Sequence, residues 1–196
     1  MKIYTIGHSS HSIESFLNLL ISQGIEVLVD VRSSTFSRFA PQYNSKSLRA
    51  FLIEKGIKYL YLGNELGGRP TDRQYYDLDG HVLYNLLAES PLFFKGISRL
   101  VEGLDKCTIA LLCAEEDPSG CHRRLLVGRI LRERGISVLH IRGDGSVQTE
   151  EELFEEEKSR KKDDSQLPLF VGEETKEWKS TQSVLLRKGP KNSSNH

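Results

Sequence analysis

The first 141 residues alternate short apolar runs, rich in β-branched side chains, with amphipathic segments that often close at glycine. This alternation is typical of a parallel sheet, because each strand needs a crossover helix to bring the chain back to the same edge. The expected strands are residues 2–7, 26–32, 57–63, 107–113 and 137–141. We therefore predict an α/β fold with a mostly parallel sheet of about five strands and helices on both faces, a Rossmann-like arrangement of three layers.

The segments between these strands carry helix signals. The first, residues 12–24, begins with Ser12 as a candidate N-cap, places apolar side chains at helical spacing and stops at Gly24. The other expected helices are residues 45–56, the pair 81–90 and 91–104, and residues 122–135. A chain of 196 residues is long enough for one such domain and a tail.

The composition changes after Ile141. A charge block, EEELFEEEKSRKKDD, is followed by a segment rich in Ser, Lys, Asn, Gly and Glu, which buries too little apolar surface to offset its ordering entropy. We place a single α/β domain at residues 1–147. Residues 148–196 are expected to form a charged, largely disordered tail with at best a short acidic helix.

Charge and cysteine content restrict the partners and the compartment. Lys and Arg together equal Asp and Glu together at 27 each, so no whole-protein field attracts nucleic acid or an anionic membrane. Three cysteines, an odd number in a chain that does not need disulfides, fit a reducing interior. No apolar run reaches the roughly 18 residues of a membrane span, and the N-terminal residues do not resemble a signal peptide. We expect a soluble cytoplasmic protein without a membrane partner.

Reactive and charged side chains follow the predicted strands, at the edge where such sheets bind ligands. They are His8, Ser9, Asp30, Arg32, Glu65, Arg69, Cys113, Glu115, Cys121, His122 and Arg123. We predict that Glu115 is a general acid or base, because a carboxylate in this role needs neither a metal nor a thiolate. The further catalytic candidates are His8, Asp30 and Cys113. The candidates for binding an anionic substrate are Arg32, Arg69, Arg123, Ser9, Cys121 and His122.

Several of these residues also have a purely structural interpretation. His8 and Ser9 can cap the approach to the first helix. Asp30 and Arg32 can pair as a salt bridge, and Arg123 with Arg124 can form a solvated helix face. Their occurrence together after consecutive strands favours a site over these separate explanations.

The cysteines allow two alternatives. Cys113, Cys121 and His122 are ligand types that zinc prefers, with His8 as a fourth candidate. The spacing does not match a zinc ribbon, and adjacent residues on a helix point about 100° apart. We therefore predict no cofactor and keep zinc as the less favoured alternative. A nucleophilic Cys113 at a strand end is the second alternative, although Arg123 lies too far along the chain for a cysteine phosphatase loop.

Several motifs together are similar to those of a prokaryotic family, the domain of unknown function 488. They are TIGHS, DVR, LGGRP and LLCAEEDPSGCHRRLL followed by VLHI, in the order of the family and over roughly residues 1–142. The resemblance implies a compact α/β domain with a site built from the motif residues, and it brings no reaction with it. The matching positions are His8, Asp30, Arg32, Gly67, Gly68, Cys113, Glu115, Cys121, His122 and Arg123. The chain departs from the family in the loop after Arg32, where its proline comes only at Pro41.

The tail carries the pentapeptide QLPLF at residues 166–170. It is similar to the peptide by which bacterial polymerases and repair proteins bind the sliding clamp. In such a peptide Leu167, Leu169 and Phe170 would fill an apolar groove and Gln166 would supply an oriented amide. The alternative is that the segment folds back onto the domain as a hydrophobic latch.

These features give three hypotheses. The first is an enzyme of DNA or nucleotide maintenance that is recruited to the sliding clamp and acts on a phosphorylated or nucleobase substrate. The second is a non-catalytic adaptor that binds a nucleotide or a protein and reaches the clamp through its tail. The third is a zinc or thiol-redox protein. A near-neutral domain argues against strong nonspecific binding to duplex DNA.

Overall fold

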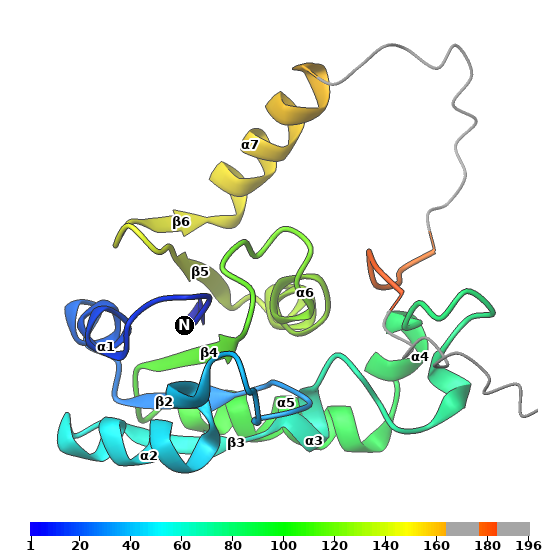
Figure 1. Ribbon diagram of the computed structural model, residues 1–196. Helices are drawn as coiled ribbons and strands as arrows, with labels where there is room; N and C mark the ends of the chain where they lie inside the picture. The colour runs from blue at the N-terminus through cyan, green and yellow to red at the C-terminus, as the bar shows by residue number, and fades with distance from the viewer. Residues whose placement is uncertain (164–176, 184–196) are drawn as a thin grey trace, which may run out of the picture.

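The computed structural model describes residues 1–163 and 177–183 (Figure 1). Within them the strands form one six-stranded sheet in the order β3-β2-β4-β1-β5-β6. The strands are β1 (Lys2–Gly7), β2 (Val27–Asp30), β3 (Lys58–Tyr61), β4 (Ile109–Cys113), β5 (Ser137–Ile141) and β6 (Val147–Thr149). Strands β1 to β5 are parallel, and β6 runs antiparallel to β5. The predicted α/β fold with a mostly parallel sheet is confirmed, and β6 is a strand that the sequence did not reveal.

The helices lie close to where the sequence placed them. They are α1 (Ile13–Ser22), η1 (Pro41–Tyr43), α2 (Ser45–Glu54), α3 (Gly63–Leu66), η2 (Arg73–Tyr75), α4 (Tyr84–Ala88), α5 (Pro91–Leu104), η3 (Arg123–Gly128), α6 (Arg129–Glu133) and α7 (Glu150–Asp163). Ser12 caps α1 by accepting a hydrogen bond from the Ser15 amide at 3.2 Å. Gly24, with φ of 63°, follows the helix in the left-handed conformation that glycine adopts without strain.

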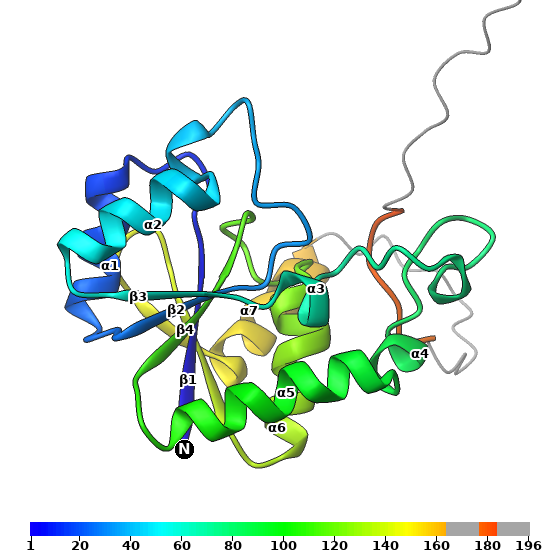
Figure 2. The same ribbon diagram turned by 90° about the horizontal axis from the view of Figure 1, so that it is seen from below.

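Two clusters of buried apolar side chains lie on opposite faces of the sheet. In β4, Ile109 and Leu111 belong to one cluster, and Ala110 and Leu112 belong to the other. Successive strand residues point to opposite faces, so a continuous apolar run supplies both clusters. Helices α1 and α2 pack on one face and helices α3 to α6 on the other, as Figure 2 shows for α1, α2, α5 and α6. The three-layer arrangement is therefore confirmed.

The fold continues past the point at which the composition changes. In Figure 1, α7 follows β6 at one edge of the sheet. At the start of α7, the buried carboxylate of Glu150 accepts hydrogen bonds from His140 Nε2 at 2.9 Å and from Arg124 Nε at 3.0 Å. Leu153, one turn later, is completely buried. These contacts, rather than the weak amphipathic pattern of the charge block, hold α7 against the domain.

Residues 177–183 pack on the domain beside α4 (Figure 1). Lys179 forms an antiparallel bridge with Leu83, and the Trp178 indole N–H donates to the carbonyl of Leu125 at 2.8 Å. The charged composition predicted disorder for these residues, and the single apolar residue Trp178 was too little to indicate a contact with the domain. The peptide QLPLF at 166–170 lies outside the described residues. Among the residues that the structure describes, no helix combines the length and the apolar character needed to span a bilayer.

Candidate functional site

A cavity of about 470 Å³ opens at the carboxyl-terminal edge of the parallel strands. Its lining includes Arg32 after β2, Arg69 after α3, Cys113 at the end of β4, Glu115 in the following loop, and His122 just before η3. The sequence predicted that strand-end residues would gather at this edge. We call this space the strand-end cavity.

Two thiols and an imidazole meet at one side of the strand-end cavity. The Sγ atoms of Cys113 and Cys121 and a ring nitrogen of His122 all lie within 4.8 Å of one another. His122 Nδ1 is 3.7 Å from Cys113 Sγ and 3.9 Å from Cys121 Sγ. On its other side, His122 Nε2 lies 3.0 Å from the carbonyl oxygen of Val31, so Nε2–H donates to that carbonyl and Nδ1 faces the thiols.

This geometry corrects the reason given from sequence against a metal. The prediction assumed that Cys121 and His122 lie on one helix and point about 100° apart. Cys121 instead lies in the turn before the helix, so the helical rotation does not separate the two side chains. The turn brings the Sγ atom of Cys121 within 4.8 Å of that of Cys113 at the end of β4. The expected fourth candidate, His8, is not a member of the cluster.

The two thiols have opposite pKa shifts. A hydrogen bond from Cys121 and the nearby cations His122 and Arg123 hold the pKa of the Cys113 thiol well below its ordinary value despite its burial. Burial raises the pKa of Cys121 well above its ordinary value, and the neighbouring Cys113 raises it further. Burial by itself lowers the pKa of His122, but the Cys113 thiolate, the hydrogen bond to Val31 and the charge of Glu115 together outweigh that effect, and the pKa is raised. Cys113 is therefore the thiolate of the pair and Cys121 its hydrogen-bond donor.

Asp30 and Arg32 form the buried pair that the structural interpretation expected. Arg32 Nε donates to Asp30 Oδ1 at 2.9 Å and Nη2 donates to Oδ2 at 2.6 Å. Nη2 also donates to the Tyr43 carbonyl at 2.9 Å, and the Tyr59 hydroxyl donates to Asp30 Oδ2 at 2.8 Å. Asp30 is fully buried and has no part in the cavity lining. Its function in this geometry is to fix the Arg32 guanidinium at the cavity wall.

Arg123 is completely buried and does not line the cavity. Its Nη1 donates to the carbonyl of Glu115, and its Nη2 donates to the carbonyl of Glu116 at 2.6 Å. Its Nε donates to Thr5 Oγ1 at 3.3 Å. The expected solvated helix face is absent at this residue. Arg123 holds the backbone of the loop that carries Glu115, which makes it a positioning residue for that loop.

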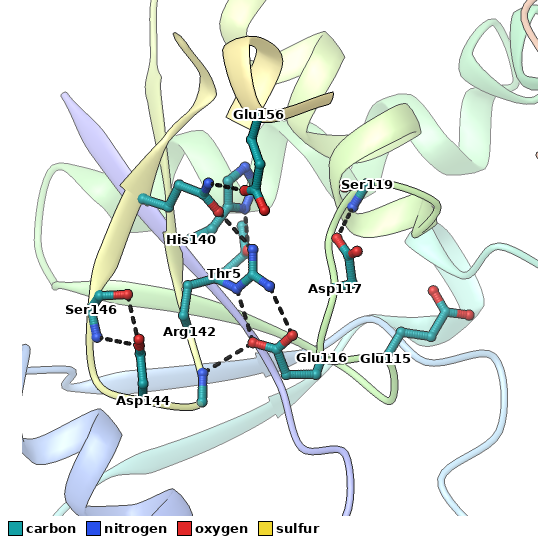
Figure 3. Close-up of polar contacts among 12 residues, drawn as sticks. Thr5, Glu115, Glu116, Asp117, Ser119, His140, Arg142, Asp144, Ser146 and Glu156 are labelled. Atoms are coloured by element: carbon teal, nitrogen blue, oxygen red, sulfur yellow. Dashed lines mark hydrogen bonds and ion pairs between the residues drawn. The ribbon is translucent and has the colours of Figure 1, made fainter. Parts of the chain in front are cut away.

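Glu115 is exposed in the strand-end cavity, whereas its neighbour Glu116 points elsewhere. Glu116 accepts two hydrogen bonds from Arg142, each at 2.9 Å, and one from the Gly143 amide at 3.0 Å. In Figure 3 the Glu115 side chain extends away from this pair. The loop thus separates a carboxylate that fastens the β5–β6 turn from a carboxylate that faces the cavity.

His8 and Ser9, both predicted as site residues, are not part of the cavity lining. The His8 ring stacks on Tyr43 with a centroid separation of 4.2 Å, and its Nδ1 donates to the Ser9 carbonyl at 2.9 Å. Burial lowers the pKa of His8, so the imidazole is neutral. Ser9 has a φ of 44°, in the left-handed region, and its amide donates to the Ala114 carbonyl at 2.8 Å. Both residues tie the loop after β1 to the loop after β4.

Residues 180–183 form a wall of the strand-end cavity that the sequence did not predict. The Ser180 amide donates to the Val82 carbonyl at 2.9 Å, and the Thr181 hydroxyl donates to the Gly120 carbonyl at 3.2 Å. Tyr84 and Asp117 also line the cavity without having been predicted. Nothing in the local pattern could have found the wall, because its position depends on contacts with distant parts of the chain.

Searches of curated proteins and of solved structures return no match to this chain. A family model does match. It covers residues 12–130, which include β2 to β4, Arg32, Cys113 and the cluster residues up to His122. The chain belongs to this family, described as domain of unknown function DUF488.

Proposed function

We propose that the chain is an enzyme that acts on a phosphorylated nucleotide or a nucleobase in the strand-end cavity. The observation that carries the proposal is the joint presence of reactive and cationic groups in one lining. A thiolate at Cys113, an imidazole at His122 and an exposed carboxylate at Glu115 border the same space as Arg32 and Arg69. A packed α/β domain places such groups together far more often at a ligand site than elsewhere.

Arg32 and Arg69 are the side chains of the lining that would hold an anionic group of the substrate. Asp30 and the Tyr43 carbonyl accept the hydrogen bonds of Arg32 Nε and Nη2. Among the described residues Nη1 has no acceptor, so it is available to a ligand. Arg69 is exposed at the rim, and its amide is fixed by a hydrogen bond to Ser33 Oγ at 2.9 Å. The Arg32 guanidinium is held by Asp30 and the Tyr43 carbonyl, so it would lose less entropy on binding a phosphate than a free side chain would.

Glu115 is the residue best placed for general acid–base chemistry. Its backbone is held by Arg123, while its carboxylate is exposed to the cavity. A positioned general acid or base contributes roughly 10²- to 10⁴-fold to a rate. Glu115 in this role would exchange a proton with a substrate or a water bound beside Cys113.

The test is a conversion assay on a panel of nucleoside phosphates and free nucleobases, read by liquid chromatography and mass spectrometry. The wild type is expected to convert at least one compound, and Glu115→Gln to reduce that rate by about 10²-fold or more. Glu151→Gln, an exposed carboxyl on α7, is the matched control and should keep the wild-type rate. Equal rates in wild type and Glu115→Gln would contradict the role of Glu115. Binding of a compound without conversion would support the adaptor alternative.

Recruitment by the sliding clamp is the second part of the proposal, and it depends on the sequence alone. QLPLF at 166–170 lies in the chain between α7 and the segment 177–183. A clamp bound to this peptide would hold the domain close to DNA, so the domain would not need a basic surface to bind DNA itself. Calorimetric titration of the chain against a bacterial sliding clamp should show binding. Leu169→Ala combined with Phe170→Ala should abolish it, and Glu173→Ala combined with Glu174→Ala should not. A wild-type chain that shows no heat of binding would refute recruitment.

A further inference from the structure

We propose that Cys113, Cys121 and His122 bind a Zn²⁺ ion through three protein ligands and leave its fourth position open to the strand-end cavity. Metal binding itself stands on the geometry of the three side chains. The use of the metal in catalysis rests on the proposed function. The two are tested separately below.

The separations between the donor atoms fit one tetrahedral ion. Zinc binds cysteine sulfur at about 2.3 Å and histidine nitrogen at about 2.0–2.1 Å. Tetrahedral angles at these bond lengths place a sulfur and a nitrogen roughly 3.6 Å apart. His122 Nδ1 is 3.7 Å from Cys113 Sγ and 3.9 Å from Cys121 Sγ. Both sulfur–nitrogen distances exceed the ideal by no more than a few tenths of an ångström, and all three donor atoms lie within 4.8 Å of one another, so a small contraction of the cluster would close it around one ion.

The surroundings of His122 are those of a metal ligand. Its Nε2–H donates to the Val31 carbonyl at 3.0 Å, and such a bond orients the ring and directs the Nδ1 lone pair at the ion. Gly68 packs directly on the ring, since a Cβ at this position would lie 2.6 Å from His122 Cγ. Cys113 and Cys121 are buried, which keeps the thiols away from competing solvent. The ligands are therefore held in place before the metal binds.

The open position follows from the lining. Cys113 and His122 border the strand-end cavity, whereas Cys121 is completely buried and does not. An ion bound to all three thus presents its free side to the cavity. Among the described residues the cluster has no fourth His, Cys, Asp or Glu. Three protein ligands with a water in the fourth position are the arrangement of catalytic zinc, whereas structural zinc takes four.

Glu115 borders the same cavity and supplies the proton acceptor that a zinc-bound water needs. The carboxylate takes one proton from the water, and the resulting hydroxide bonds through oxygen to an electrophilic carbon or phosphorus of the substrate. The bond to the leaving group breaks, and Glu115 returns the proton to that group. The products are the hydroxylated substrate and the protonated leaving group, so the step is a hydrolysis that needs no other reactant.

Metal content is measured on the full-length chain after reconstitution with Zn²⁺ and removal of excess ion. The wild type should hold about one zinc per chain. Replacement by Co²⁺ should give the thiolate charge-transfer bands and the visible absorption of a four-coordinate site. Cys113→Ser, Cys121→Ser and His122→Ala should each bind zinc more weakly than the wild type, and Cys107→Ser, at a cysteine outside the cluster, should bind normally.

Gly68→Ala removes no ligand but displaces the His122 ring, so it should weaken zinc binding by roughly 10- to 100-fold. This variant and the cobalt spectrum of the wild type keep the test decisive if a cysteine variant fails to fold. A zinc-free wild type, a disulfide between Cys113 and Cys121 after reconstitution under reducing conditions, or equal loss of zinc in Cys107→Ser would overturn the proposal. Glu115-dependent conversion by a zinc-free chain would refute the catalytic use of the metal and leave the proposed function intact. Zinc at this site without any conversion would do the reverse.

Discussion

Replacing Glu150 by alanine should destabilise the protein by about 3 kcal/mol. Its carboxylate, 6% exposed, bridges His140 and Arg124, the residue that follows Arg123 in η3. Removing one partner of a buried ion pair costs roughly 3–5 kcal/mol, because the remaining charge stays buried without compensation. Arg124 keeps a second partner, Glu157, at 2.7 Å, and this favours the lower end of the range. The substitution removes one contact between α7 and η3, the helix that begins next to His122.

The assay is urea unfolding followed by circular dichroism, with the midpoint and the slope fitted separately. Glu150→Ala should lower the midpoint at an unchanged slope, which is the sign of lost native stability. Glu151→Ala, an exposed neighbour on the same helix, should change the free energy of unfolding by less than about 0.5 kcal/mol. A loss below about 1 kcal/mol in Glu150→Ala would show that α7 does not dock through this bridge.

Three further predictions follow from the same contacts. The free energy of unfolding should fall as the pH drops below 6.5, because burial lowers the pKa of His140 in the folded protein and the unfolded chain therefore binds the proton more readily. In urea unfolding, the midpoint should drop less with pH in His140→Gln than in the wild type. Trp178→Ala removes a hydrogen bond to Leu125 and a cation–π contact, so it should cost roughly 1–3 kcal/mol in thermal unfolding; an unchanged midpoint would mean that the segment is not docked. Gly7→Ala would place a Cβ 1.7 Å from the Glu115 carbonyl oxygen, so limited proteolysis should cut the loop after β4 faster than in the wild type, and equal rates would contradict this close approach.

The layer arrangement and the edge at which the strand-end cavity opens were predictable from sequence for a simple reason. Short runs in which every residue or every second residue is apolar indicate the strands, and parallel strands have their carboxyl ends at the same edge of the sheet. Cys113 is the last residue of β4, and Arg32 and Glu115 each lie two residues beyond a strand, so the fold alone brings them to the same cavity. These residues needed no knowledge of loop conformation.

Residues whose place depends on a turn or on a distant contact were not predictable in this way. Cys121 and His122 converge because Cys121 lies in the turn before the helix and not on the helix itself. Arg123 looked like an anion-binding residue, but three hydrogen bonds inside the protein use its guanidinium. The wall at 180–183 is set by long-range hydrogen bonds from a segment whose composition argued for disorder.

The reactive centre assigned to the carboxyl-terminal edge of the sheet is tested most directly by diffraction from zinc-loaded crystals at the zinc absorption edge. The anomalous map should contain one strong peak within bonding distance of Cys113 Sγ, Cys121 Sγ and His122 Nδ1, with its fourth position occupied by solvent on the side of Glu115 and Arg32. A map without a peak at these three atoms, or one whose peak is closed by a fourth protein ligand, would contradict it.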